Sequence, residues 1–253
     1  MRAQKSKWLV MSWSALLVAA CAFGPQLAAQ AADSKPAPTN KKLEKELANT
    51  TRPQADRDRD ANRKPAQLMT FFGVKSKMTV LDLIAGGGYM TEVLSVTVGP
   101  KGKVYSQNQG ANKALDERLA NNRLANVTNI QGEISQITPS SVDVAITVMN
   151  LHDVYNGTAK ELQTKLLRGV LGVLKPGGTF GVVDHVGVAG ADNSKLHRMT
   201  KEQAIELVTS VGFELVGEST VLAHPEDDHT KGVFDPTLRG KTDQFTLKFR
   251  KPK

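Results

Sequence analysis

Two pairs of ionisable residues stand at the ends of apolar runs and could move protons. His152 and Asp153 closely follow the β-branched run at 142–148, and Asp184 and His185 end the next such run. An imidazole has an ordinary pKa of about 6.5 and can take a proton from a hydroxyl or an amine near neutral pH. We predict that His152 is a general base and that Asp153 orients it or binds substrate. His185, with Asp184 beside it, is a second catalytic candidate, and the alternative for each histidine is a hydrogen-bonded role in shaping a rim.

A glycine-rich turn separates an apolar strand from a helix. The strand at 79–83 carries Asp82 near its end, three glycines follow at 86–88, and a helix is predicted to begin at Tyr89. Glycine has no Cβ, so the backbone of such a turn can approach a ligand closely, and the free N–H groups at a helix N-terminus attract anions. The pattern predicts a nucleotide-type cofactor, with a tight turn that binds nothing as the alternative.

This turn resembles motif I of the class I S-adenosylmethionine-dependent methyltransferases, whose usual form is acidic-x-Gly-x-Gly-x-Gly. Asp82 takes the acidic position, Gly86 and Gly88 take the second and third glycine positions, and Ile84 stands in place of the first. The resemblance implies S-adenosylmethionine as cofactor. The cofactor-binding residues that it implies are Asp82, Ala85, Gly86, Gly88 and Tyr89 in the turn, Asn108 at the ribose, Glu133 and Ile134 at the adenine, and Asn150 at the cofactor or substrate.

The elements that must position these residues alternate between strand and helix. Strands are predicted at 79–83, 102–108, 127–130, 141–148, 179–185 and 212–216, with helices beginning at Tyr89 and spanning 162–174 and 201–211. This alternation predicts an α/β fold with a doubly wound, mostly parallel sheet. The resemblance implies a Rossmann-like sheet of seven strands. The last segment, 244–250, alternates in polarity and is predicted to be a half-exposed antiparallel strand.

The N-terminal residues have the pattern of a secretory signal. Arg2, Lys5 and Lys7 precede an apolar segment at 8–23 that is too short for a membrane span. We predict a signal peptide at 1–31 with cleavage after Ala31, and hence an exported, periplasmic protein. Two alternatives are an uncleaved anchor and a lipoprotein acylated at Cys21, the only cysteine in the chain. Residues 32–52 are predicted to be a flexible tether and 53–253 the folded domain.

The composition argues against a nucleic-acid partner. The net charge is +8, but the basic residues are scattered and aromatic residues make up only 5% of the chain. A nucleic-acid site usually needs a basic patch with aromatic stacking groups. The basic surface could instead favour association with an anionic cell envelope.

A polar insertion occupies 224–243. It is too polar for a core, and a lid over the substrate and a solvated loop are equally supported. The candidates for lid contacts are Asp227, Asp228, His229, Asp235, Arg239 and Lys241. Together with the segments at 57–60 and 63–65, the insertion resembles a subgroup of predicted bacterial methyltransferases that often carry an export signal.

The resemblance implies a methyltransferase that acts on an unidentified, small-molecule acceptor. The first alternative is a non-catalytic exported ligand-binding protein that retains the fold, which the replacements at Ile84 and Asn108 favour. The second is a metal-dependent hydrolase using His152, Asp153, Asp184 and His185. No ligand motif with tight spacing supports the hydrolase, so we assign no residue to a metal.

Overall fold

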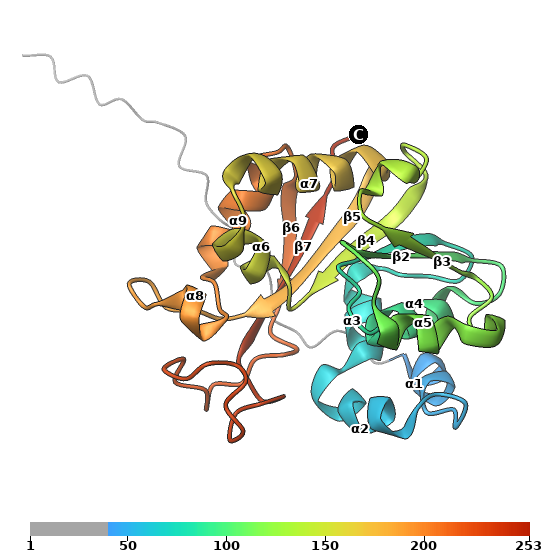
Figure 1. Ribbon diagram of the computed structural model, residues 1–253, viewed down its shortest axis with the longest axis horizontal. Helices are drawn as coiled ribbons and strands as arrows, with labels where there is room; N and C mark the ends of the chain where they lie inside the picture. The colour runs from blue at the N-terminus through green and yellow to red at the C-terminus, as the bar shows by residue number, and fades with distance from the viewer. Residues whose placement is uncertain (1–39) are drawn as a thin grey trace, which may run out of the picture. The chain divides into compact units, whose positions relative to one another are not determined.

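A single seven-stranded sheet forms the centre of the computed structural model, which describes residues 40–253 (Figure 1). The strand order is β3-β2-β1-β4-β5-β7-β6. Strands β1 to β5 run parallel, whereas β7 is antiparallel to both of its neighbours. The bounds are β1 Thr79–Leu83, β2 Lys103–Asn108, β3 Val127–Gln131, β4 Val142–Val148, β5 Leu174–His185, β6 Glu214–Ser219 and β7 Gln244–Arg250. The predicted fold class is therefore confirmed.

Helices cover both faces of the sheet. In Figure 1, α4 and α5 lie on one side and α7 and α9 on the other. The bounds are α1 Lys41–Leu47, α2 Gln54–Arg63, α3 Pro65–Phe72, α4 Tyr89–Val98, α5 Lys113–Leu119, α6 Leu151–Gly157, α7 Lys160–Val173, α8 Asn193–Leu196 and α9 Lys201–Thr209, with short 3-10 turns at Ala120–Asn122 and Ile134–Gln136. Between residues 40 and 253, no helix combines the length and apolar character needed to cross a bilayer.

Strand β4 shows why the sheet needs two helical layers. Val144 and Ile146 pack into the core that includes α3 and α4, while Ala145 between them packs into the core that includes α7 and α9. Successive side chains of a strand point to opposite faces, so a strand that is apolar at nearly every position must be covered twice. Its carboxyl end is thereby fixed from both sides.

The half-exposed strand is β6 and not β7, which corrects the prediction for 244–250. Strand β7 pairs with β5 and β6, and Thr246 on one face is as buried as Leu247 and Phe249. Strand β6 lies at the edge of the sheet and alternates between exposed and partly buried residues. The polarity of the first half of β7 alternates because buried glutamine and threonine side chains interrupt its apolar residues, and only Lys248 and Arg250 at its end are less buried.

The folded domain begins before residue 53, which shortens the predicted tether. Helix α1 starts at Lys41 and buries Leu43 and Leu47 in the core that includes α3 and α4. Its N-cap is Asn40, whose side chain accepts a hydrogen bond from the Leu43 N–H at 3.1 Å. The predicted signal peptide at 1–31 and the first part of the tether lie outside the described residues.

Candidate functional site

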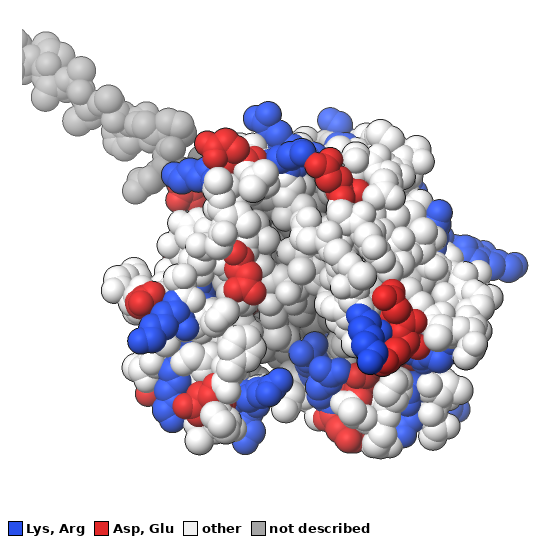
Figure 2. Space-filling view, viewed as in Figure 1, with Lys and Arg blue, Asp and Glu red and all other residues white. Residues whose placement is uncertain are grey.

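A pocket of about 510 Å³ opens at the carboxyl ends of β1, β4 and β5. The strand order reverses direction between β1 and β4, and ligands of doubly wound folds bind at such a switch point. Figure 2 shows this face hollowed near its middle, with basic side chains at the lower margin of the hollow. Eight residues predicted from the sequence line the pocket, namely Asp82, Ala85, Gly86, Tyr89, Asn150, His152, Asp153 and His185.

The glycine turn holds its shape through side chains of neighbouring strands. Ile84 has a φ of 57°, a left-handed conformation that is costly for a β-branched residue and natural for the glycine that usually stands there. Its N–H donates to the Gln107 side chain at 3.2 Å, and its carbonyl accepts from the Asn150 side chain at 3.0 Å. The turn therefore keeps the backbone path of the motif with a different residue in the first glycine position.

Asn108 binds the turn and does not line the pocket. Its side-chain oxygen accepts from the Gly86 N–H at 2.9 Å, and its side-chain nitrogen donates to the Gly86 carbonyl at 3.1 Å. An aspartate could accept the first bond but could not donate the second. The amide at this position is thus explained by the turn, because each of its polar atoms binds Gly86.

Three other predicted cofactor residues also lie outside the pocket lining. Gly88 packs closely, since a Cβ there would stand 2.7 Å from the side chain of Leu115. Glu133 is exposed and pairs with Lys165 at 2.5 Å. Ile134 is buried in the hydrophobic core, so its first role is packing.

Asp82 is buried at the end of β1 and accepts a hydrogen bond from the Thr91 hydroxyl at 2.6 Å. Burial raises the pKa of Asp82 to about 7, although hydrogen bonds from Thr91 oppose the rise. Burial therefore favours the neutral form of this carboxyl group.

Asp184 pairs with His152 and not with the side chain of its neighbour His185. The His152 Nδ1 lies 2.6 Å from Asp184 Oδ1, and the His152 backbone N–H donates to Oδ2 at 2.8 Å. Burial by itself would lower the pKa of His152, but the hydrogen bond and the charge of Asp184 raise it above 6.5. This corrects the predicted pairing, because the side chain at the end of β5 reaches across to the residue that follows β4.

His185 has a different environment. Burial lowers the pKa of His185 to about 4, so its imidazole is neutral at physiological pH. Its Nδ1 lies 2.8 Å from the hydroxyl of Thr242, just before β7. These features favour a role in holding the wall of the pocket.

His197 joins the site without having been predicted. Asp153 Oδ1 lies 3.2 Å from His152 Nε2 and 3.1 Å from His197 Nδ1. His197 follows the four-residue helix α8 in a polar connection, where no periodic pattern marks it. Only the fold brings it beside Asp153, 44 residues earlier in the chain.

Two arginines of α2 form a further part of the pocket wall. Arg59 and Arg63 line the pocket and lie 4.9 and 4.6 Å from the centre of the Tyr89 ring. The Tyr89 hydroxyl donates to Asp60 at 2.6 Å, which fixes the ring between α2 and α4. Burial, and secondly the charge of Arg59, lower the pKa of Arg63. The sequence marks residues 57–60 and 63–65 only by a family resemblance and predicts no role for their arginines.

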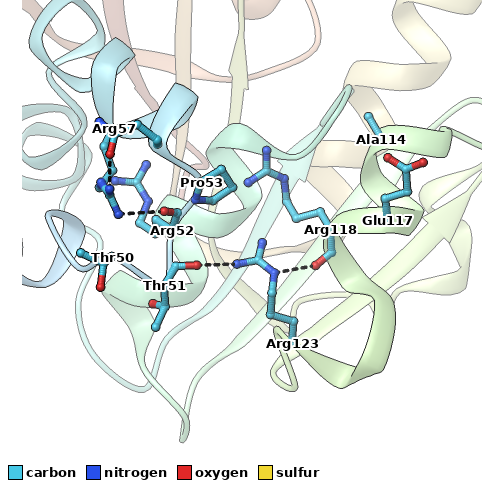
Figure 3. Close-up of a pocket in the computed structure, with 10 residues that line it drawn as sticks. Thr50, Thr51, Arg52, Pro53, Arg57, Ala114, Glu117, Arg118 and Arg123 are labelled. Carbon is cyan, nitrogen blue, oxygen red and sulfur yellow. Dashed lines mark hydrogen bonds between the residues drawn. The ribbon is translucent and has the colours of Figure 1, made fainter.

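A second pocket, of about 520 Å³, lies where α2 meets α5 (Figure 3). Four arginines line it, but three of them are already paired with acids. Arg52 binds Asp60, Arg118 binds Asp56 and Glu92, and Arg123 also binds Glu92. This pocket is therefore a seam of ion pairs that attaches the N-terminal helices to α4 and α5.

The insertion between β6 and β7 covers one side of the main pocket with apolar residues. Val233 and Phe234 line the pocket, whereas the six polar residues predicted for a lid do not, within the described part of the chain. Asp228 and Asp235 instead accept hydrogen bonds from residues two positions ahead of them. Asp227 is buried and binds Arg198 through two bonds of 2.9 and 3.0 Å. The polar residues hold the loop, and its apolar residues face the pocket.

A family profile described as "Methyltransferase domain" matches residues 74–232, more than half of the chain. The chain belongs to this methyltransferase family. Membership confirms the predicted class of enzyme, and the matched range contains the glycine turn, the His152–Asp184 pair and His197. The resemblance to an exported subgroup stays a prediction.

Solved structures share the methyltransferase fold at low sequence identity. An S-adenosylmethionine-dependent methyltransferase from Aquifex aeolicus is 19% identical, with a TM-score of 0.56 over 83% of this chain and 97% of that one. A TehB-like methyltransferase from Corynebacterium glutamicum is 16% identical, with a TM-score of 0.51 over 73% and 85%. An N1-methyltransferase from Burkholderia thailandensis, with bound S-adenosylhomocysteine, is 17% identical, with a TM-score of 0.51 over 79% of each chain. These similarities concern the fold.

Proposed function

We propose that this chain transfers a methyl group from S-adenosylmethionine to a small-molecule acceptor. The observation that carries the proposal is the motif I turn, which lines a pocket at the switch point of a sheet belonging to the methyltransferase family. The cofactor would lie over the glycine turn, and the acceptor would lie between it and the histidines. When bound, the cofactor supplies an electrophilic methyl group on a sulfonium ion.

The backbone beyond β1, β2 and β3 supports this placement. A Cβ added at Gly86, Gly110 or Gly132 would meet no atom within 4 Å, and each of these glycines lies within three residues of the end of one of the three strands. Side chains at these positions would fill the edge along which an extended nucleoside lies in this fold. The residues present therefore fit the cofactor, although both polar atoms of Asn108 already bind Gly86.

The two walls of the pocket suit different parts of the ligands. Arg63 has neither an ion pair nor a hydrogen bond within residues 40–253, so its guanidinium would bind a carboxylate group. Val233 and Phe234 would exclude water from the acceptor, which methyl transfer requires. His152 and Asp153 would contact the acceptor's nucleophilic atom.

Calorimetry with S-adenosylmethionine and its demethylated product tests the proposal on the purified chain. Ala85→Leu places a larger side chain in the pocket, and we expect it to weaken binding at least tenfold. Ala159→Leu makes the same change at an exposed alanine outside the pocket and should leave binding unchanged. Absence of binding at millimolar cofactor would contradict the proposal.

The alternative is a non-catalytic protein that retains the fold. The specific observation in its favour is Asn108, since both of its polar groups bind Gly86 and no carboxylate stands ready for a ribose. In that case the two variants at Ala85 and Ala159 would behave alike, because neither would touch a cofactor.

Export is a separate proposal that rests on residues 1–31. Cleavage after Ala31 would give a mature chain without cysteine, whereas acylation would leave Cys21 at its start. Mass spectrometry of the protein from the periplasm of an expressing cell distinguishes the two.

A further inference from the structure

We propose that His152, Asp153 and His197 form a binding site for a divalent transition-metal ion, with Zn²⁺ as the reference ion. Each side chain offers one ligand atom, and all three atoms lie within 4.8 Å of one another. Two imidazoles and one carboxylate are a donor set that zinc and its neighbours in the first transition row prefer. The site stands on its own side chains and does not depend on methyl transfer.

The distances from the Asp153 carboxylate to the two imidazoles suit the binding of all three side chains to one metal ion. Its Oδ1 lies 3.2 Å from His152 Nε2 and 3.1 Å from His197 Nδ1. In a tetrahedral zinc site with bonds of about 2.0–2.1 Å, neighbouring ligand atoms are about 3.3 Å apart. The carboxylate therefore already stands at ligand spacing from both imidazoles.

The fold directs the correct nitrogen of His152 towards the ion. Nδ1 is occupied by Asp184, which is fully buried and also accepts the backbone N–H groups of His152 and His185. Only Nε2 is left to bind a ligand, and it faces Asp153. Metal-binding histidines usually bind a carboxylate through their second nitrogen in this way, which fixes the ring and makes it a stronger donor.

His197 is held in place on both sides. It has a φ of 55° and a ψ of 51°, and its N–H closes helix α8. The next residue, Arg198, is fully buried, binds Asp227 through both ends of its guanidinium and accepts a bond from Asn156. A non-glycine residue in this conformation persists only where its surroundings over-determine it. The left-handed backbone of His197 is unfavourable by itself, and the contacts on both sides of it hold the imidazole in place.

The exposures of the three ligands leave room for a further ligand. The His152 side chain is buried, whereas those of Asp153 and His197 are 60% and 40% exposed. Zinc sites with three protein ligands and an open position bind water or substrate there. An acceptor with a hydroxyl or thiol group would bind the ion and lose its proton more easily. His152 would then be a ligand and not the general base predicted from the sequence.

The competing interpretation is an imidazolium at His152, held between Asp184 and Asp153 without any ion. Metal titration of the untagged, metal-free chain separates the two. We expect one equivalent of Co²⁺ to bind, with the visible absorption of a nitrogen- and oxygen-ligated site, and Zn²⁺ to displace it.

Three variants assign the ligands. His197→Gly removes the imidazole but suits the left-handed backbone, so the fold should be retained. We expect Asp184→Asn to lower the Zn²⁺ affinity about 10–100-fold. His197→Gly and Asp153→Asn, which each remove a ligand, should lower it further. His229→Gln is the matched control, because His229 pairs with Asp243 away from the site.

The absence of stoichiometric metal binding, or equal affinity in the wild-type chain and His197→Gly, would overturn the proposal. An equal loss in His229→Gln would overturn it too. Cofactor binding is measured separately without metal, so failure of the metal site and failure of the proposed methyl transfer cannot be confused.

Discussion

The two ends of the pocket use their polar side chains differently. At the glycine turn, Gln107, Asn108 and Asn150 bind backbone atoms and fix the path of the chain. At the histidine end, His152, Asp153 and His197 face one another, and the backbone is held from outside by Asp184 and by the Arg198–Asp227 pair. The first end is shaped by its hydrogen bonds, whereas the second keeps donor and acceptor atoms for a ligand.

The difference lies in which elements contribute the residues. The glycine turn draws on the ends of adjacent strands, so its shape follows from the sheet. The histidine end joins the end of β4, the end of β5, α8 and the loop before β7. Variants that affect only one end can test this division.

The largest effect is expected from Asp227→Ala, at the histidine end. Arg198 is fully buried, and removal of its only acidic partner in the described chain would leave an unpaired charge, costing about 3–5 kcal/mol in the free energy of unfolding. Urea denaturation measures the loss. Glu226→Ala, at a neighbouring exposed acid, should change it by less than about 0.5 kcal/mol. A loss below about 1 kcal/mol for Asp227→Ala would show that the histidine end is not held from this side.

A pH-dependent effect is expected from Asp82→Asn, at the glycine turn. The pKa of about 7 in the fold exceeds the ordinary 3.8, so the native state favours the protonated form. The contribution of Asp82 to the free energy of unfolding is fully present below pH 4 and is lost as the pH rises to 7. It amounts to roughly 4 kcal/mol at most.

The asparagine variant should therefore gain stability over the wild-type chain between pH 4 and 8. Denaturation midpoints across this range measure the gain. Asp58→Asn removes the same charge from an exposed position and should show no comparable trend. Parallel pH profiles for wild-type and Asp82→Asn chains would contradict the raised pKa.

Asn108→Asp should cost about 1–3 kcal/mol, since it removes the donor to the Gly86 carbonyl and brings a second acceptor against it. The same exchange at exposed Asn62 is the control. An Asn108→Asp variant with unchanged stability and tighter cofactor binding would contradict this role. Asn108 would then stand where a carboxylate binds the ribose and would not be needed to hold the turn.

The smallest effect is expected from Glu133→Ala. Glu133 and Lys165 are both 64% exposed, and such pairs contribute at most about 1 kcal/mol. Because Glu133 does not line the pocket, calorimetry should give unchanged cofactor affinity. A tenfold loss of affinity would restore the predicted adenine contact.

The sequence predicted the strands of the sheet and the position of the glycine turn, but not the role of Asn108, whose side chain binds Gly86. Apolar runs of five to seven residues mark β1 and β4, and the glycines are needed by the local backbone, so both signals are local. The sequence does not show that helix α1 packs on the domain, because two leucines in a short charged segment are a weak signal.

The histidine end could be predicted only in part. His152 and Asp153 follow a recognisable strand, but the partner of Asp184 depends on the pairing of β4 with β5. His197 depends on a left-handed residue after a four-residue helix and on a buried ion pair with the distant Asp227. Such long-range contacts leave no periodic trace in the sequence.

Strands β6 and β7 are antiparallel, and this pairing decides on which side of the sheet the loop at 220–243 lies. Because β7 runs antiparallel to both neighbours, the loop leaves and re-enters the sheet on the side of the pocket. The loop therefore covers one side of the pocket, and the buried ion pair in which Arg198 donates to Asp227 helps to hold it there. Replacing this loop with another, while keeping the Arg198–Asp227 pair, offers a way to change which acceptors the pocket admits.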